Sequence, residues 1–166
     1  MTQLKWDEQL YGTGVAHLDE QHQELFDGLN SLTAFLNNTS VHNDAESQKK
    51  VIELLYFLGE YALRHFKDEE KVFARCGHPL AEANKEAHQF FFKKFFEYND
   101  KLINHAFSHD LLLELHAFLN FWLIDHIMKI DSRLRDFGER PSMELYRRSA
   151  KKKGVFTSFL ALFQKK

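Results

Sequence analysis

The sequence of 166 residues contains a single cysteine, Cys76, and very little proline or glycine. One cysteine cannot form an internal disulfide or supply a cysteine-ligated metal site. With only 2 Pro and 7 Gly, the chain has few of the residues that build turns between strands, so we predict an all-α fold. The amino terminus, MTQLKWDEQL, lacks the basic-then-apolar pattern of a secretory signal, and we therefore expect a cytoplasmic protein.

Long apolar runs are also missing, since no uninterrupted stretch approaches the roughly 20 residues that cross a bilayer. Charge is unevenly distributed: residues 1–140 contain 15 Lys and Arg against 23 Asp and Glu, whereas residues 141–166 contain 7 against 1. An acidic body lacks the basic stripe that phosphates require, so we expect no nucleic-acid partner. We divide the chain into an acidic domain, 1–140, and a basic tail, 141–166.

Apolar residues recur at alternating steps of three and four along most of the acidic domain, which is typical of amphipathic helices. The pattern predicts four helices, over residues 18–37, 45–75, 80–106 and 110–137. An arm, 1–15, precedes them and is expected to pack across the bundle. Because the connections between the helices are short, we predict an antiparallel, up-down-up-down four-helix bundle.

Six polar side chains interrupt the apolar stripes at positions that face the predicted core. They are His22, His65, Glu69, His88, His126 and Asp131. Buried imidazoles and carboxylates are unfavourable unless something in the core binds them. A dinuclear metal centre inside the bundle satisfies all of them at once, and this ligand set makes iron the first metal to consider.

Two spacings among these residues have different consequences. His65 and Glu69 are four residues apart and share one helical face, about 6 Å apart at Cβ. His126 and Asp131 are five residues apart, which places them about 140° apart around an ideal helix. Either Asp131 reaches around from the edge of the stripe, or a π-type widening of the helix brings the two into line.

The motifs around these residues resemble those of the bacterial hemerythrins, non-haem di-iron proteins, over roughly residues 3–138. The resemblance is carried by Trp6, Gly14-Val15, the LDEQH that ends at His22, the HFKDEE that begins at His65, and the WLIDH that ends at His126, followed by Asp131. It implies two iron ions, joined by an oxo or hydroxo bridge, in the core of a four-helix bundle.

The resemblance also implies a role for each polar core residue. It assigns one iron to His22 and His65, the other iron to His88 and His126, and the bridging carboxylates to Glu69 and Asp131.

One position departs from the family pattern. The family pairs two histidines four residues apart on its third helix; His88 is the second, and Asn84 stands where the first belongs. Asn84 either offers a weak carbonyl ligand, or hydrogen-bonds a metal-bound water, or leaves space; the structural alternative is that it faces solvent. His78, in the loop beside Pro79, is a less favoured substitute ligand. An extra open position favours oxidation by O2 over reversible carriage.

The remaining histidines and the phenylalanine cluster are interpreted as structural. We expect solvated side chains at His17, His42, His105, His109 and His116, and mainly core positions at Phe90, Phe91, Phe92, Phe95 and Phe96. Cys76 is interpreted as incidental.

The tail has a basic amphipathic pattern. Lysines and arginines at 147–153 precede an apolar face formed by Phe156, Phe159, Leu160 and Phe163. Such a helix binds an anionic membrane surface or a partner's groove, or it folds back on the acidic body, and a linker to a further domain is the remaining alternative. Because members of the resembled family also occur fused to chemotaxis receptors and cyclic-di-GMP enzymes, a signalling partner is one expectation.

These observations lead to three hypotheses about function. The first is a non-haem di-iron protein, not an enzyme, that binds O2 or a similar small diatomic and works as an O2 or redox sensor. The second is a di-iron oxidoreductase that reduces nitric oxide or peroxide. The third is a metal-free scaffold whose tail carries the function.

Overall fold

The computed structural model describes residues 1–38, 44–104 and 107–137. Its elements, in chain order, are α1 (Glu8–Tyr11), α2 (Ala16–Asn37), α3 (Ala45–Cys76), α4 (Ala81–Asn104), α5 (His109–Lys129) and a 3-10 helix, η1 (Asp131–Phe137). The all-α prediction is confirmed, and the first three long helices lie within two residues of their predicted bounds. The fourth ends earlier than predicted.

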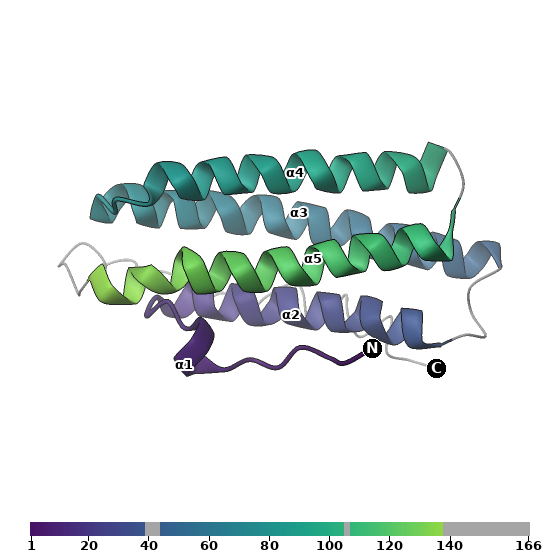
Figure 1. Cartoon of the computed structure of the whole chain (residues 1–166), viewed down its shortest axis with the longest axis horizontal. Coiled ribbons are helices and arrows are strands. Elements are labelled where there is room, and N and C mark those ends of the chain that lie inside the picture. Colours follow the sequence, from purple (N-terminus) through teal and green to yellow (C-terminus); the bar gives the residue numbers. More distant parts are fainter. Residues whose placement is uncertain (39–43, 105–106, 138–166) are drawn as a thin grey trace.

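The four long helices lie side by side and run alternately in opposite directions (Figure 1). Neighbouring pairs are α2 with α3, α3 with α4, α4 with α5, and α5 with α2, which closes the bundle. The predicted up-down-up-down topology is therefore correct. As a result, the beginnings of α2 and α4 and the ends of α3 and α5 meet at the same end of the bundle.

Local signals set the helix boundaries. The Asp44 side chain accepts a hydrogen bond from the Ser47 backbone N–H at 2.9 Å, an N-cap for α3. At the other end, Gly77 adopts a left-handed conformation with φ of 62°, which terminates the helix without the strain that a side chain would bring. The Ser108 side chain caps α5 through the backbone N–H of Leu111.

The arm, 1–15, packs along α2, and its short helix α1 also contacts α5 and η1. The Asn30 side chain accepts from the backbone N–H of Leu4 at 2.7 Å and donates to its carbonyl at 3.0 Å. The Met1 amine donates to Asn37 near the other end of α2, at 2.7 Å. Leu4, Trp6 and Tyr11 pack against the main core.

The apolar core is divided into two clusters. A large cluster fills most of the bundle, and a small cluster near its end consists of Val15, Leu18, Val72, Phe73, Cys76 and Leu134. Along α2, buried Leu18 of the small cluster is followed by buried His22 and then by Leu25 of the large cluster. Along the antiparallel α3 the order is reversed, from Leu58 of the large cluster through His65 and Glu69 to Val72 of the small cluster. We call the buried polar residues between the two clusters the polar layer: His22, His65, Glu69, Asn84, His88, His126 and Asp131.

One helical stretch, His109–Phe137, is long and apolar enough to cross a membrane when judged by length and composition alone. The stretch contains Glu114 and Asp125, so it is not an uninterrupted apolar run of the kind that this sequence lacks. The stretch lies between α4 and α2 and buries His116, His126 and Asp131. A helix that is apolar on most sides is also typical of a bundle core, and this arrangement fits that explanation.

The tail, 141–166, with its predicted apolar face at Phe156, Phe159, Leu160 and Phe163, lies outside the described residues. His42 and His105 lie outside them too.

Candidate metal centre

The six polar core residues named from the sequence meet in the polar layer, each less than 5% exposed. In one half of the layer, two imidazoles face one carboxylate oxygen. The Nε2 atom of His22 lies 3.0 Å from Oε1 of Glu69, and Nε2 of His65 lies 3.2 Å from the same oxygen. His22 Nε2 also lies 3.5 Å from Oδ2 of Asp131.

The other half repeats this arrangement with the remaining carboxylate oxygens. Nε2 of His88 lies 3.0 Å from Oε2 of Glu69, and Nε2 of His126 lies 3.3 Å from Oδ1 of Asp131. The two Nε2 atoms are 3.2 Å apart. Two imidazole nitrogens facing each other at this distance, beside a carboxylate, form the geometry in which one cation is chelated.

Each carboxylate therefore serves both halves of the layer. Glu69 directs Oε1 to His22 and His65 and directs Oε2 to His88, while Asp131 divides its oxygens between His22 and His126. Two sets of ligand atoms, each close enough to hold one ion, share Glu69: His22, His65 and Glu69, and Glu69, His88 and His126. The arrangement fits two metal ions joined by carboxylate bridges.

Asp131 reaches the layer because α5 ends at Lys129. Ile130 has φ of −116° and ψ of −63°, and the tighter helix η1 begins at Asp131. Neither sequence-based alternative, a reach from the stripe edge or a π-type widening, describes this break, and the expected continuous helix 110–137 is wrong. The break rotates the aspartate toward His126 despite a spacing of five residues.

Two polar side chains outside the layer orient its imidazoles. Gln21 Oε1 lies 3.0 Å from Nδ1 of His65, and Glu70 Oε1 lies 3.0 Å from Nδ1 of His88. When Nδ1–H donates to such an acceptor, the lone pair is on Nε2, directed at the centre. The sequence analysis assigned no role to Gln21 or Glu70, although both belong to the motifs that carry the resemblance.

Aromatic rings cover three of the four imidazoles. Phe66 stacks on His88 with centroids 3.9 Å apart and planes 3° apart, and Trp122 stacks on His126 at 4.4 Å and 13°. Trp6 from the arm lies over His22 at 6.2 Å. These rings fix the imidazole planes and shield three of the imidazoles from bulk water.

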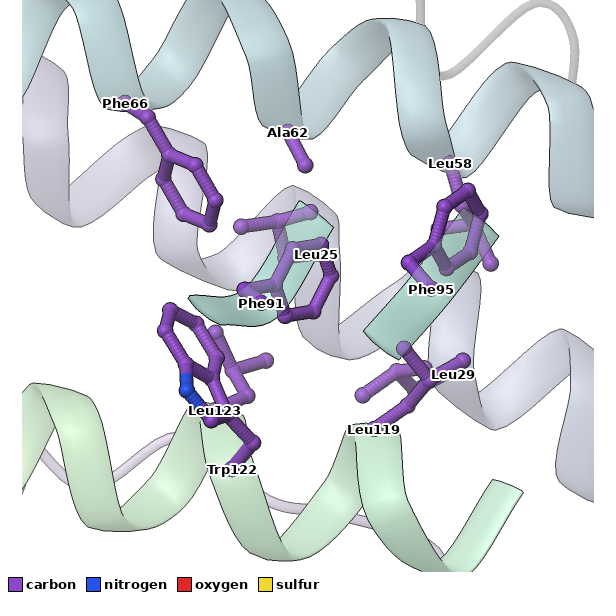
Figure 2. A pocket seen from close by; sticks show the side chains of 10 residues that line it. All are labelled: Leu25, Leu29, Leu58, Ala62, Phe66, Phe91, Phe95, Leu119, Trp122 and Leu123. Carbon is purple, nitrogen blue, oxygen red and sulfur yellow. The ribbon is translucent and has the colours of Figure 1, made fainter. Parts of the chain in front are cut away.

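An apolar cavity of about 30 Å³ lies among the four long helices. Figure 2 shows its lining, in which Phe66 and Trp122 stand beside aliphatic and phenylalanine side chains from the rest of the large cluster. Because these two rings also stack on His88 and His126, the cavity borders one half of the polar layer. Apolar cavities of this size exclude water, so the space suits a small apolar molecule.

The charges of the layer are strongly coupled. Burial favours the neutral acid, but the adjacent imidazoles outweigh it and hold the pKa of Glu69 well below its usual range. Burial also opposes a charge on His22, yet the adjacent carboxylates of Asp131 and Glu69 raise its pKa to about 9. In the metal-free protein the histidine is therefore protonated at neutral pH, and a metal ion must displace that proton.

The protein's own groups do not fully satisfy the layer. Both oxygens of Asp131, Nδ1 of His22 and both amide atoms of Asn84 are buried without a hydrogen-bond partner. Buried polar atoms are normally paired, and carboxylate oxygens without a hydrogen-bond partner beside four convergent imidazoles are the arrangement expected where cations bind. Nitrogen and carboxylate donors in this number fit two borderline ions such as iron.

Asn84 is completely buried, so the alternative in which it faces solvent is wrong. His78 does not replace the missing histidine: its Nδ1 accepts from the Leu80 backbone N–H, and its Nε2 lies 3.4 Å from the Arg133 carbonyl. It therefore belongs to the turn after α3.

Several other expectations need correction. His17 and His116 are buried, with exposed fractions of 8% and 7%, because His17 lies near the polar layer and His116 bonds Thr33 of α2 at 2.7 Å. Phe90 and Phe96 are exposed, whereas Phe91 and Phe95 belong to the core as expected. His109 is exposed, as predicted.

Comparisons with known proteins agree with the geometry. The family model described as hemerythrin HHE cation binding domain matches residues 13–136. The bacteriohemerythrin of Stenotrophomonas maltophilia is 29% identical over 136 residues, 82% of either chain, and that of Pseudomonas aeruginosa is 28% identical over 148 residues, 87% of this chain and 88% of the relative. A crystal structure of wild-type hemerythrin superimposes with a TM-score of 0.64 at 24% identity, covering 79% of this chain and 94% of that one, which supports the fold alone.

Proposed function

Since the chain belongs to the hemerythrin family, whose members bind O2 at a di-iron centre, we propose that the polar layer of this protein holds two iron ions. His22 and His65 hold one ion, and His88 and His126 hold the other. Glu69 and Asp131 bridge the pair. The observation that carries this assignment is the division of each carboxylate between the two halves of the layer.

The ligand is O2 or a similar small diatomic. Two bound iron ions supply the affinity for O2 and the electrons that reduce it. The cavity bordered by Phe66 and Trp122 supports a small apolar ligand, because its volume of about 30 Å³ is too small for an organic substrate.

We assign the protein to O2 or redox sensing, and the basis is Asn84. Where the family pattern has a histidine, this side chain is buried and carries no hydrogen bond. One half of the layer therefore offers two imidazoles where a complete family site has three, and an exchangeable position remains beside His88 and His126. Solvent and anions enter there, which promotes oxidation by O2 and opposes reversible carriage.

The test restores the absent imidazole. In Asn84→His, we expect a changed visible spectrum and slower oxidation of the ferrous protein in air. The measurement is the rate of spectral change after O2 is admitted to anaerobic, iron-loaded protein. Asn120→His, at a half-buried amide of α5 outside the layer, is the matched control. A variant at position 84 with the wild-type spectrum and oxidation rate would contradict the sensing assignment.

A second candidate function is a di-iron oxidoreductase that reduces nitric oxide or peroxide. The exchangeable position at Asn84 favours it, because turnover requires a site where substrate enters and product leaves. Steady-state assays with an added reductant distinguish the two: an enzyme consumes many equivalents of nitric oxide or peroxide, and a sensor stops after one oxidation. Iron analysis that finds well under one iron per chain would instead support a metal-free scaffold.

We further propose a cytoplasmic protein whose tail, 141–166, transmits the state of the centre to a signalling partner or to an anionic membrane surface. The charge of the tail supports this role, since it contains 7 Lys and Arg against a single Glu. Sedimentation with anionic vesicles, compared between the full chain and a chain ending at residue 140, tests the membrane alternative.

A further inference from the structure

Asn84 lies one helical turn before His88 on α4, at the boundary between the polar layer and the small apolar cluster. Its backbone is satisfied, since its N–H bonds the Leu80 carbonyl at 2.8 Å. Its side chain is 0% exposed, and neither the amide nitrogen nor the amide oxygen has a partner. The side chain is therefore an unused hydrogen-bonding group next to the centre.

Four asparagines elsewhere in the described part of the chain are different. The amide nitrogens of Asn30, Asn37, Asn104 and Asn120 each donate a hydrogen bond, to a backbone carbonyl or to a carboxylate. A buried amide without a partner destabilises the fold, because the group lost its hydrogen bonds to water and gained none. A bound ligand that completes the site removes this penalty.

The amide is suited to a ligand rather than to the metal. An asparagine side chain is shorter than that of histidine, so its end cannot extend to where an imidazole Nε2 at the same position would be. Its oxygen is a weak ligand beside four imidazoles, whereas its NH2 group offers two N–H donors. Within residues 1–38, 44–104 and 107–137, no Lys or Arg is buried, so no lysine or arginine of this part of the chain lies in the layer to pair with an anion.

We propose that the Asn84 amide donates a hydrogen bond to a small anion bound in the half of the centre formed by His88 and His126. The amide then favours ligands that can accept a hydrogen bond from its neutral NH2 group, and a negatively charged acceptor most of all. The proposal rests on the proposed function, because the anion needs the metal ions for most of its affinity. It concerns what Asn84 contributes once those ions are in place.

The first experiment measures azide binding to the oxidised, iron-loaded full chain by spectral titration. We expect the azide Kd to rise about 10- to 100-fold in Asn84→Leu and in Asn84→Ala, the effect of losing one hydrogen bond to a charged acceptor. In Asn84→Asp the Kd rises at least as much, since a carboxylate repels the anion. Asn120→Leu, the matched control, keeps the wild-type Kd.

Asn84→Asp also separates donation to an anion from coordination by the amide oxygen. If that oxygen were an iron ligand, the stronger oxygen donor of aspartate would preserve iron content and azide affinity together. Retained iron with weakened azide binding supports the proposal, and retained iron with unchanged azide binding in the Leu, Ala and Asp variants overturns it. Wild-type protein that takes up no iron overturns the proposed function, and this inference falls with it.

A second experiment needs no metal. If the amide is unpaired, replacing it by an apolar side chain removes the penalty, and the metal-free protein melts at a higher temperature in at least one of Asn84→Leu and Asn84→Ala. Asn120→Leu, which removes an amide bonded to the His116 carbonyl at 2.8 Å, melts at a lower temperature. A fall in Tm for both variants at position 84 shows that the amide has a partner in the protein, and this result overturns the proposal.

Discussion

The large apolar cluster and the polar layer lie on the same four helices and are equally inaccessible to solvent, yet they depend on different interactions. In the cluster, each leucine or phenylalanine is stabilised by its own contacts and by the water it excludes. In the layer, the carboxylates depend on several partners at once: Glu69 faces three imidazoles, and Asp131 lies between those of His22 and His126. Substitutions in the cluster should therefore act locally, whereas substitutions in the layer should act on the whole centre.

The largest expected effect is at the residue shared by both halves. Glu69→Gln keeps the shape of the side chain but removes the bridging charge, so we expect iron affinity to fall at least about 100-fold. The stabilisation that iron confers on the wild type is about 4 kcal/mol at a free iron concentration 1,000 times Kd. At the same iron concentration it should fall to about 1.4 kcal/mol or less in the variant. Iron analysis and thermal unfolding with and without iron measure both effects. Glu60→Gln, an exposed carboxylate of the same helix, is the control.

The next effect tests whether the cluster is independent of the layer. Leu115→Ala empties a fully buried site of the large cluster and should lower the unfolding free energy by about 3 kcal/mol, while iron per folded chain stays unchanged. Leu134→Ala makes the same change in the small cluster, three residues after Asp131. This variant should lose iron affinity as well as stability. Equal iron affinity in both variants would contradict the distinction.

A smaller effect is expected outside the layer. Glu70→Ala removes the acceptor at Nδ1 of His88, so the imidazole loses its orientation and part of its basicity. Because Glu70 is half-buried, we expect a loss near the lower end of the usual range, about tenfold in iron affinity. Competition with a chelator measures it, and Glu53→Ala, exposed on the same helix, is the control. No change in affinity would show that stacking by Phe66 alone orients His88.

The smallest expected effect is that of pH on a histidine beside the layer. Burial lowers the pKa of His17 to about 4 from an ordinary value near 6.5. Between pH 6.5 and pH 4, His17 therefore binds a proton in the unfolded chain but stays neutral in the folded chain. This contribution destabilises the metal-free protein as pH falls from 6.5 to 4. In His17→Gln, the loss of unfolding free energy between pH 7 and pH 5 should be smaller by about 1 kcal/mol. Denaturant titration at both pH values measures the difference, and in the exposed His109→Gln it should match the wild type.

Much of the site could be predicted because histidines and carboxylates stand at helical spacing among leucines, where only a bound ion explains them. The periodicity also located α2, α3 and α4 to within two residues. The expectation that His116 is solvated failed because its partner, Thr33, is 83 residues away in the sequence. No glycine or proline directly follows Lys129, so nothing in the sequence indicated that α5 ends there, and the expected helix was too long.

The sequence by itself determined the class of fold, the antiparallel order of the helices and the identity of the groups that meet in the core, because apolar periodicity and ligand spacing are local properties. Only the tertiary structure decided how Glu69 and Asp131 divide their oxygens, which rings cover the imidazoles, and that the amide of Asn84 is buried without a partner. These features depend on contacts of about 3 to 4 Å between side chains of different helices. A local sequence pattern does not determine the geometry of such long-range contacts.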